Sequence, residues 1–370
     1  MNRVGLYVHI PYCKRKCRYC DFFSVTNLLS TDGYVEAILR EARCYQGEDF
    51  SIDTLFVGGG TPSLLGESEW RKLMEGLRAI LPIESGAEIS VECNPDSASE
   101  ALFALWKELG VNRVSLGVQS LNDKVLATVG RLHDGKTALV AVDNACKVFD
   151  NVNVDYMVGL PYQTVGGVQN DIRRLLSLGV SHVSVYSLIL EEGTPLCTSV
   201  KKGEIRLPDD EVAVDLYDAA VATLEAAGLQ RYEISNFCRE GKECKHNLHC
   251  WQLYPYIGLG AAAHSFYGGK RYAHPCDLDR YMLGGEPIPE DCENDRRGEA
   301  VMLGLRTAEG VSLSRYSELF GRDFTVDFAA ALQNPTIRPC LLVNDKSISI
   351  RPEYLYVSNR IINIFLDCLE

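Results

Sequence analysis

The feature that most constrains the fold of this chain is a strand-then-helix pattern that occurs six times within its first 235 residues. Short runs rich in Val, Ile and Leu are typical of strands buried on both faces, and they occur at 4–10, 53–59, 88–93, 113–119, 151–159 and 182–189. Each is followed by an amphipathic stretch that predicts a helix, at 33–45, 68–81, 98–109, 136–149, 165–178 and 209–227. Repeated units of this kind form a parallel sheet covered by helices. We therefore expect an α/β fold, a partial (βα)6 barrel.

Polar and glycine-rich residues gather where the predicted strands end. A cysteine-rich loop follows the first strand, and GGGTP (58–62) closes the second. Glu92 ends the third strand, Gln119 ends the fourth, and Asp155 lies in the fifth. In barrels of parallel strands the functional site lies at the carboxyl ends of the strands. The sequence therefore predicts a site on this rim.

The pattern changes after about residue 236. Residues 236–251 are polar and loop-like, and residues 256–269 are rich in Gly and Ala and predict a loop that packs against the barrel. Helices are then expected at 295–307, 312–321, 326–333 and 358–368, with two short strands at 340–343 and 347–351. We divide the chain into a barrel (1–235), a connecting segment (236–290) and a small α+β domain of winged-helix-like shape (291–370).

Composition narrows the class of protein. The net charge of the 370-residue chain is −13, which argues against a nucleic-acid-binding protein. No signal peptide and no apolar run long enough to span a membrane is evident, so we expect a cytoplasmic protein. In a reducing compartment the fourteen cysteines should be free thiols or metal ligands, not disulfides.

Three cysteines stand close together in IPYCKRKCRYCDFF (10–23), at positions Cys13, Cys17 and Cys20. Three thiolates can bind three irons of a 4Fe-4S cluster and leave the fourth iron open to another ligand. The alternative is a zinc site, which would take a fourth ligand from elsewhere in the chain. Zinc sites usually contain two separated C-x-x-C pairs, so the spacing here favours the cluster.

The motif Cys13-x-x-x-Cys17-x-Tyr19-Cys20 resembles the cluster loop of the radical S-adenosylmethionine (SAM) superfamily. The resemblance implies that the open iron binds SAM and that the cluster cleaves it to a 5′-deoxyadenosyl radical. VGGGTPS (57–63) resembles the glycine motif of the superfamily, in which backbone comes close to the methionine end of SAM. The positions implied to contact SAM are Tyr7, Tyr19, Gly59, Gly60, Thr61, Glu92, Gln119, Arg131 and Asp155.

Within this superfamily, the order of the sequence blocks resembles the group of coproporphyrinogen III dehydrogenases and heme chaperones. The dehydrogenases carry a further cysteine two residues beyond the third, where this chain has Phe22. Coproporphyrinogen dehydrogenase activity is therefore not expected. The resemblance is stronger to the heme chaperones of the HemW family, although whether the chain is an enzyme stays open.

A second block supports the resemblance to heme chaperones. It ends in His-Asn-x-x-Tyr-Trp in that family and reads HNLHCW here, with Cys250 in place of Tyr. The resemblance implies that His246 is a heme ligand, and a neutral imidazole is a common axial ligand. The alternative for His246 is a histidine that binds backbone or packs on Trp251. No heme role is expected for His249 or Cys250, and His264 is a weaker second candidate.

The expected function is that of a heme chaperone that binds a 4Fe-4S cluster, SAM and heme and transfers heme to an acceptor hemoprotein. One alternative is a radical SAM coproporphyrinogen III dehydrogenase, and another is a radical SAM enzyme with a different substrate. The sequence leaves open which hemoprotein receives heme, whether the chain touches a membrane peripherally and whether it forms a homodimer.

Overall fold

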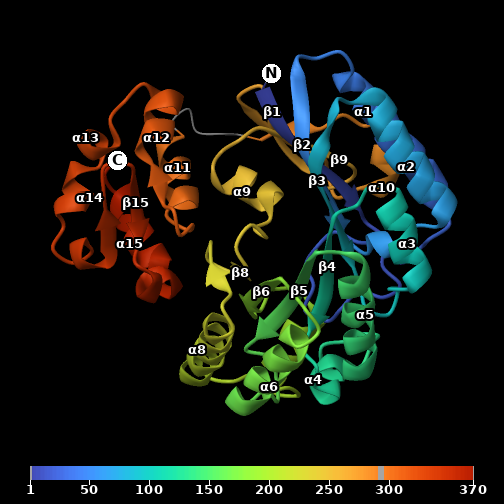
Figure 1. Cartoon of the computed structure of the whole chain (residues 1–370), viewed down its shortest axis with the longest axis horizontal. Coiled ribbons are helices and arrows are strands. Elements are labelled where there is room, and N and C mark those ends of the chain that lie inside the picture. The colour runs from blue at the N-terminus through green and yellow to red at the C-terminus, as the bar shows by residue number, and fades with distance from the viewer. Residues whose placement is uncertain (1, 291–295, 370) are drawn as a thin grey trace.

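The computed structural model describes residues 2–290 and 296–369. Figure 1 shows the strands and helices of the first 235 residues on one side and the C-terminal domain on the other, with helix α9 (Lys245–Trp251) on the side of the barrel that faces this domain. Cys292 and the predicted boundary between the connecting segment and the last domain lie outside the described residues. The other thirteen cysteines are free thiols.

Six consecutive parallel strands form the centre of a large sheet, which confirms the predicted partial-barrel fold. Their bounds are β1 (Asn2–Ile10), β2 (Phe50–Gly59), β3 (Ile83–Cys93), β4 (Arg113–Gln119), β5 (Asn151–Val158) and β6 (His182–Ser187). Alternate residues of β1, such as Val4, Leu6 and Val8, are fully buried in the core shared with the helices. The residues between them face the other side of the sheet, because side chains alternate along a strand.

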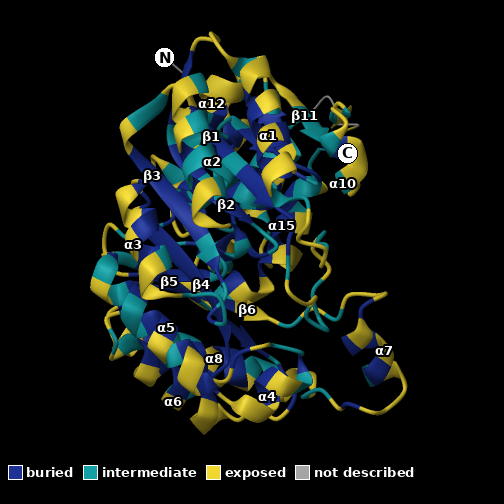
Figure 2. Ribbon diagram, turned by 90° about the vertical axis from the view of Figure 1, so that its right-hand side faces the viewer, coloured by how far each residue is buried: buried dark blue, intermediate teal, exposed yellow. Residues whose placement is uncertain are grey.

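Helices cover the outer face of this sheet, except α7 (Pro195–Lys201), which stands apart from it (Figure 2). Their bounds are α1 (Thr31–Ala42), α2 (Glu67–Ile80), α3 (Glu100–Glu108), α4 (Asp123–Thr128), α5 (Gly135–Val148), α6 (Val165–Leu176), α7 (Pro195–Lys201) and α8 (Asp210–Ala226). Several begin at a side-chain cap that the sequence carries openly: Ser99, Asp134, Thr164 and Asp209 each accept a hydrogen bond from a backbone N–H of the first turn. The short helices α4 and α7 were not predicted, because each lies in a loop and is too short to show a helical period.

The connecting segment differs from its prediction. Residues 245–251, expected to be loop-like, form helix α9, and residues 256–269 contribute strands instead of a loop. The reason for the helix is Glu88 on β3, whose carboxylate accepts hydrogen bonds from the backbone N–H groups of Lys245 and His246 at 3.2 Å each. A cap supplied by a residue this far away in the sequence cannot be predicted from the local sequence pattern.

Additional strands extend the sheet at both edges. On one side, β9 pairs in parallel with β1, and β10, β11 and β12 follow in antiparallel order; on the other, β8 and β7 follow β6. Their bounds are β7 (Gln230–Arg231), β8 (Asn236–Cys238), β9 (Tyr256–Leu259), β10 (His264–Tyr267), β11 (Lys270–Ala273) and β12 (Ile288–Pro289), with helix α10 (Leu278–Met282) after β11. These strands partly cover the edges that six parallel strands would leave open.

The C-terminal domain is a small α+β unit with its own core, as predicted. A three-stranded antiparallel sheet has the order β13-β15-β14, and its core contains Tyr316, Phe324, Phe328 and Phe365. The bounds are α11 (Arg297–Gly304), β13 (Val311–Ser312), α12 (Leu313–Phe320), α13 (Phe324–Asp327), α14 (Ala329–Gln333), β14 (Leu341–Val343), β15 (Ser347–Ile350) and α15 (Ser358–Leu366). The single helix predicted over 326–333 is instead the pair α13 and α14. Across both described ranges, no helix is long and apolar enough to cross a membrane.

Removing the Glu88 side chain tests the long-range cap. We expect Glu88→Ala to destabilise the protein by about 1–3 kcal/mol, because backbone donors of Lys245 and His246 lose a buried charged acceptor. Hydrogen exchange should accelerate at 244–251 before it accelerates elsewhere. Glu75→Ala, on the exposed side of α2, is the control and should change neither quantity. Unchanged exchange at 244–251 in Glu88→Ala would contradict this account of α9.

Candidate functional site

A cavity of about 540 Å³ lies at the carboxyl ends of the parallel strands, beneath the cysteine loop. Its lining includes all three cysteines of the loop and every position implied to contact SAM except Tyr7: Cys13, Cys17, Cys20, Tyr19, Gly59, Gly60, Thr61, Glu92, Gln119, Arg131 and Asp155. These residues come from four strands and three loops. Parallel pairing brings them together, since it places the ends of adjacent strands at one edge.

The three cysteines line one cavity but do not form a group that could hold a single metal ion. Within the described ranges, no three His, Cys, Asp or Glu side chains stand close enough together to hold one metal ion. A tetrahedral zinc site needs its ligands to converge on one point, whereas each cysteine of a four-iron cube binds a different iron. The chemistry of three thiols around one cavity therefore fits a 4Fe-4S cluster, which Cys13, Cys17 and Cys20 would hold.

Positive charge surrounds this loop. The Nη1 group of Arg131 donates to the Cys17 sulfur at 3.5 Å, and its Nη2 donates to Asn94 Oδ1 at 2.6 Å and to the Gly117 carbonyl. Burial raises the pKa of the Cys20 thiol, so an uncharged thiol is favoured there until a metal or a cation compensates the thiolate. Arg131 supplies one such cation and is held by the ends of β3 and β4.

Two carboxylates also line the cavity. Glu92 accepts a hydrogen bond from the Gly59 N–H at 2.9 Å, and Asp155 accepts one from Asn153 at 2.8 Å. Burial, and next the charge of Asp155, raise the pKa of Glu92 to about 7, and burial also raises the pKa of Asp155. Both side chains keep an edge toward the cavity. The pair suits a ligand that brings a positive charge or hydroxyl donors, such as an amino group or a ribose.

The glycines of GGGTP have a structural reason in the protein itself. Gly59 has φ of +107°, and a Cβ there would lie 2.4 Å from the His9 ring. A Cβ on Gly60 would lie 2.8 Å from the Tyr12 carbonyl oxygen at the start of the cysteine loop. These glycines allow the end of β2 to pack closely against β1 and the loop that follows it, so they position the cysteines whether or not SAM also touches them.

Tyr7 lies deeper in the barrel than the other predicted positions. Its hydroxyl is hydrogen-bonded to His9 Nδ1 at 3.0 Å, and the other ring nitrogen of His9 is 3.2 Å from the Phe23 carbonyl oxygen in the cysteine loop. On its other side, the Tyr7 ring is stacked with the His246 ring at 6.4 Å between centroids. Tyr7 therefore links the cysteine loop to helix α9 and does not line the cavity.

His246 is enclosed by the barrel and does not join the cavity of the cysteines. Its Nδ1 is 3.0 Å from Thr54 Oγ1 on β2, and its ring is stacked on Phe56 at 5.4 Å. Burial lowers the pKa of His246 to about 3, so the imidazole is neutral. The structure thus gathers the predicted cluster and SAM positions in one place and sets the predicted heme ligand apart from them.

The neighbouring candidates have partners of their own. His249 Nε2 is 3.3 Å from Asp53, and His264 is exposed with its Nδ1 3.2 Å from Glu290. Cys250 is half-buried, and desolvation raises its thiol pKa to about 11. None of these three side chains lines the cavity of the cysteines.

Sequence reasoning missed several residues of this site. Asn94, Ser115 and Tyr186 also line the cavity. Asn94 donates to Thr61 Oγ1 at 2.9 Å and accepts from Arg131, so it joins two predicted residues. Its position directly after the third predicted strand could have identified Asn94 as a residue of the site. Tyr186, at the end of β6, occupies the equivalent place on the last parallel strand.

Comparison with family models gives two matches. The radical SAM superfamily model matches residues 7–175, and the model of the HemN C-terminal domain matches residues 293–353. The first range contains the cysteine loop and nearly all of the cavity lining. The second covers most of the C-terminal domain.

Similar proteins of known name cover nearly the whole chain. Heme chaperone HemW of Bacillus subtilis is 34% identical over 97% of this chain and 98% of its own length. HemW of Synechocystis is 37% identical over 83% of this chain and 78% of its own length. Among solved structures, coproporphyrinogen III oxidase (HemN) of Escherichia coli matches with a TM-score of 0.82 and 22% identity, over 98% of this chain and 90% of that chain.

The buried carboxylate Glu92 should make stability depend on pH. Its pKa rises from an ordinary 4.5 to about 7 on folding, so the stability it contributes is complete below 4.5 and is lost as pH rises through 7. Glu92→Gln cannot ionise and should gain about 1–3 kcal/mol relative to the wild type between roughly pH 5 and pH 8. Denaturation of the metal-free protein at both pH values measures this gain.

The exposed Glu75→Gln is the matched control and should show no pH-dependent difference from the wild type. A constant difference between Glu92→Gln and wild type at both pH values would show that Glu92 is not shielded from water.

Proposed function

This chain belongs to the HemW family of heme chaperones within the radical SAM superfamily, and on that basis we propose that it binds a 4Fe-4S cluster, SAM and heme and passes the heme to an acceptor hemoprotein. The observation that carries the proposal is the single cavity that joins the three cysteines to the carboxylates of Glu92 and Asp155. Thiols that could hold a cluster and carboxylates that could accept hydrogen bonds suit the two ends of SAM.

Each wall of the cavity has a role in this proposal. Cys13, Cys17 and Cys20 would hold the cluster, which supplies an open iron to chelate SAM when it is bound. Glu92 and Asp155 would accept hydrogen bonds from the amino group or the ribose hydroxyls of SAM. Arg131, fixed by Asn94 and Gly117, would balance the negative charge of the thiolates and of the SAM carboxylate.

Phe22 favours a carrier over a coproporphyrinogen dehydrogenase. It lines the mouth of the cavity with 71% of its surface exposed and offers no thiolate where the dehydrogenases carry a further cysteine. The likeness to E. coli HemN concerns the fold alone at 22% identity. Coproporphyrinogen dehydrogenase activity is therefore the alternative that the experiments below distinguish from heme transfer.

His246 is the proposed axial ligand of heme iron. Its contacts in the barrel show which interactions must break before it can bind iron. The ring is buried between Phe56 and Tyr7, and Nδ1 is engaged with Thr54. The neutral imidazole is ready to coordinate iron without losing a proton. To reach a heme, however, the first turn of α9 must leave the barrel and give up its bonds to Glu88.

The proposed cluster ligands can be tested through iron content. After anaerobic reconstitution we expect Cys20→Ser to lose most of the bound iron and sulfide and the visible absorbance of the cluster, because a hydroxyl is a poor ligand for iron. Cys44→Ser, an exposed free thiol on the outside of the barrel, should reconstitute like the wild type. A full cluster in Cys20→Ser would refute the assignment of this loop.

The proposed carrier function can be tested by an anaerobic hemin titration of the reconstituted protein, followed by Soret absorbance. We expect saturable binding at about one heme per chain and a shifted Soret band in His246→Ala, because the axial ligand changes. His264→Ala, on an exposed strand, should keep the wild-type spectrum. No saturable hemin binding, or decarboxylation of coproporphyrinogen with SAM, would contradict the carrier function.

A further inference from the structure

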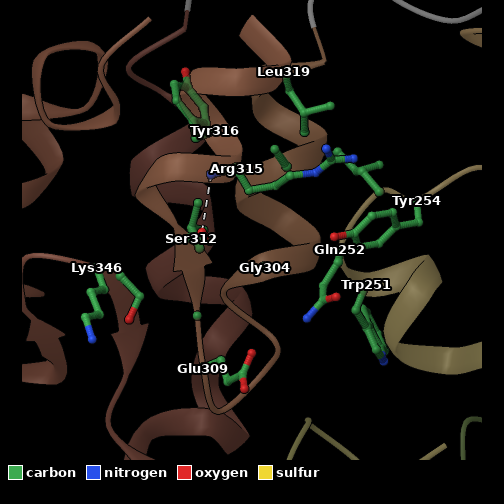
Figure 3. A pocket seen from close by; sticks show the side chains of 15 residues that line it. Trp251, Gln252, Tyr254, Gly304, Glu309, Ser312, Arg315, Tyr316, Leu319 and Lys346 are labelled. Carbon is green, nitrogen blue, oxygen red and sulfur yellow. Dashed lines mark hydrogen bonds between the residues drawn. The ribbon is translucent and has the colours of Figure 1, made fainter. Parts of the chain in front are cut away.

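A second cavity, of about 450 Å³, lies between the end of helix α9 and the C-terminal domain. Figure 3 shows Trp251 and Tyr254 approaching it from α9 and the turn that follows, and Arg315 and Leu319 approaching it from α12. Ala300 of α11 adds further apolar surface. A volume of this size is ordinary for a site that binds one small molecule or cofactor.

The cavity offers positive charge beside an aromatic wall. The Arg315 guanidinium lies 4.6 Å from the centre of the Tyr254 ring, and its Nη1 makes only a 3.4 Å contact to Glu318. Its Nε is buried and has no hydrogen-bond partner in the part of the chain that the structure describes. A buried donor without a partner destabilises the protein. An anionic ligand that accepts a hydrogen bond from Nε would remove this cost.

The other charges around the cavity belong to Lys346 and Glu309. Both are exposed and stand away from Tyr254 and Arg315 in Figure 3. Lys346 offers a second cation to a dianionic ligand, whereas Glu309 would oppose an anion on its side of the cavity. The favourable place for an acidic group is therefore at Arg315, away from Glu309.

The lining contains no histidine, cysteine or methionine, and so it offers none of the commonest iron ligands. What it offers is the aromatic side chains of Trp251 and Tyr254, apolar side chains and an arginine whose Nε has no hydrogen-bond partner among the described residues. These features fit a planar apolar ring system that carries carboxylates on its edge, which is the chemistry of a porphyrin with its propionates.

We propose that this cavity is the docking site for heme, with the macrocycle against Trp251 and a propionate on Arg315. The inference rests on the proposed heme function and adds a place and a partner that the cysteine cavity does not provide. Helix α9 then has its two ends in different compartments, with His246 in the barrel and Trp251 in the docking cavity. Docking here needs no movement of the first turn of α9. Ligation of the same heme by His246 needs that movement, so docking comes before ligation.

The test compares hemin with hemin dimethyl ester, in which both propionates are masked, on the reconstituted full chain. We expect Arg315→Gln to weaken hemin binding about tenfold, the usual size for a charge-assisted hydrogen bond, and to leave ester binding unchanged. Trp251→Leu should weaken both ligands. Arg338→Gln, an exposed arginine of the same domain, is the matched control and should bind both ligands as the wild type does.

A second variant covers the case in which Arg315→Gln or Trp251→Leu does not fold. Leu319→Trp keeps both partners and fills the cavity from α12, where Leu319 is 39% exposed, and it should weaken hemin binding by tenfold or more. Wild-type hemin affinity in both Arg315→Gln and Leu319→Trp would overturn the docking site and leave the carrier function standing. No saturable hemin binding by the wild type would overturn both.

Discussion

The parallel pairing of β1 to β6 is the constraint on which the rest of the structure depends. It places the last residues of six strands at one edge, so that Glu92 from β3, Asp155 from β5 and the loop after β1 share a single cavity. The close packing of Gly59 and Gly60 against β1 and the cysteine loop then sets where the thiols lie. The chemistry proposed for the chain thus follows from strand register before any cofactor is considered.

The cavity is lined by unlike charges. Arg131 stands beside the thiols, and the charge of Arg113 lowers the pKa of Glu92 and of Asp155 by less than burial raises it. Burial therefore raises the pKa of Glu92 toward neutrality, which is costly for the folded chain and useful for binding a ligand that supplies hydrogen bonds or positive charge. Binding energy of this kind would come from charges that the fold has already placed.

Helix α9 connects the two parts of the molecule. Glu88 of the barrel caps its first turn, His246 extends into the barrel, and Trp251 at its other end faces the C-terminal domain. The hydrogen bond of Tyr7 to His9, and of His9 to the carbonyl of Phe23, continues this line of contacts to the cysteine loop. A change at the cluster and a change at α9 are therefore joined by packed side chains.

The sequence by itself determined the repeated βα pattern, the end of each parallel strand and the family, because short strands with buried faces, caps such as Asp134 and the spacing of the three cysteines are local signals. Only the tertiary structure decided the helical state of 245–251 and the strand at 256–259, since the Glu88 cap and the pairing with β1 come from distant residues. It also decided that Tyr7 lies outside the cysteine cavity and that His246 and Trp251 face different compartments. Side-chain direction in a packed interior depends on which neighbours fill the space, and that information is spread over the whole chain.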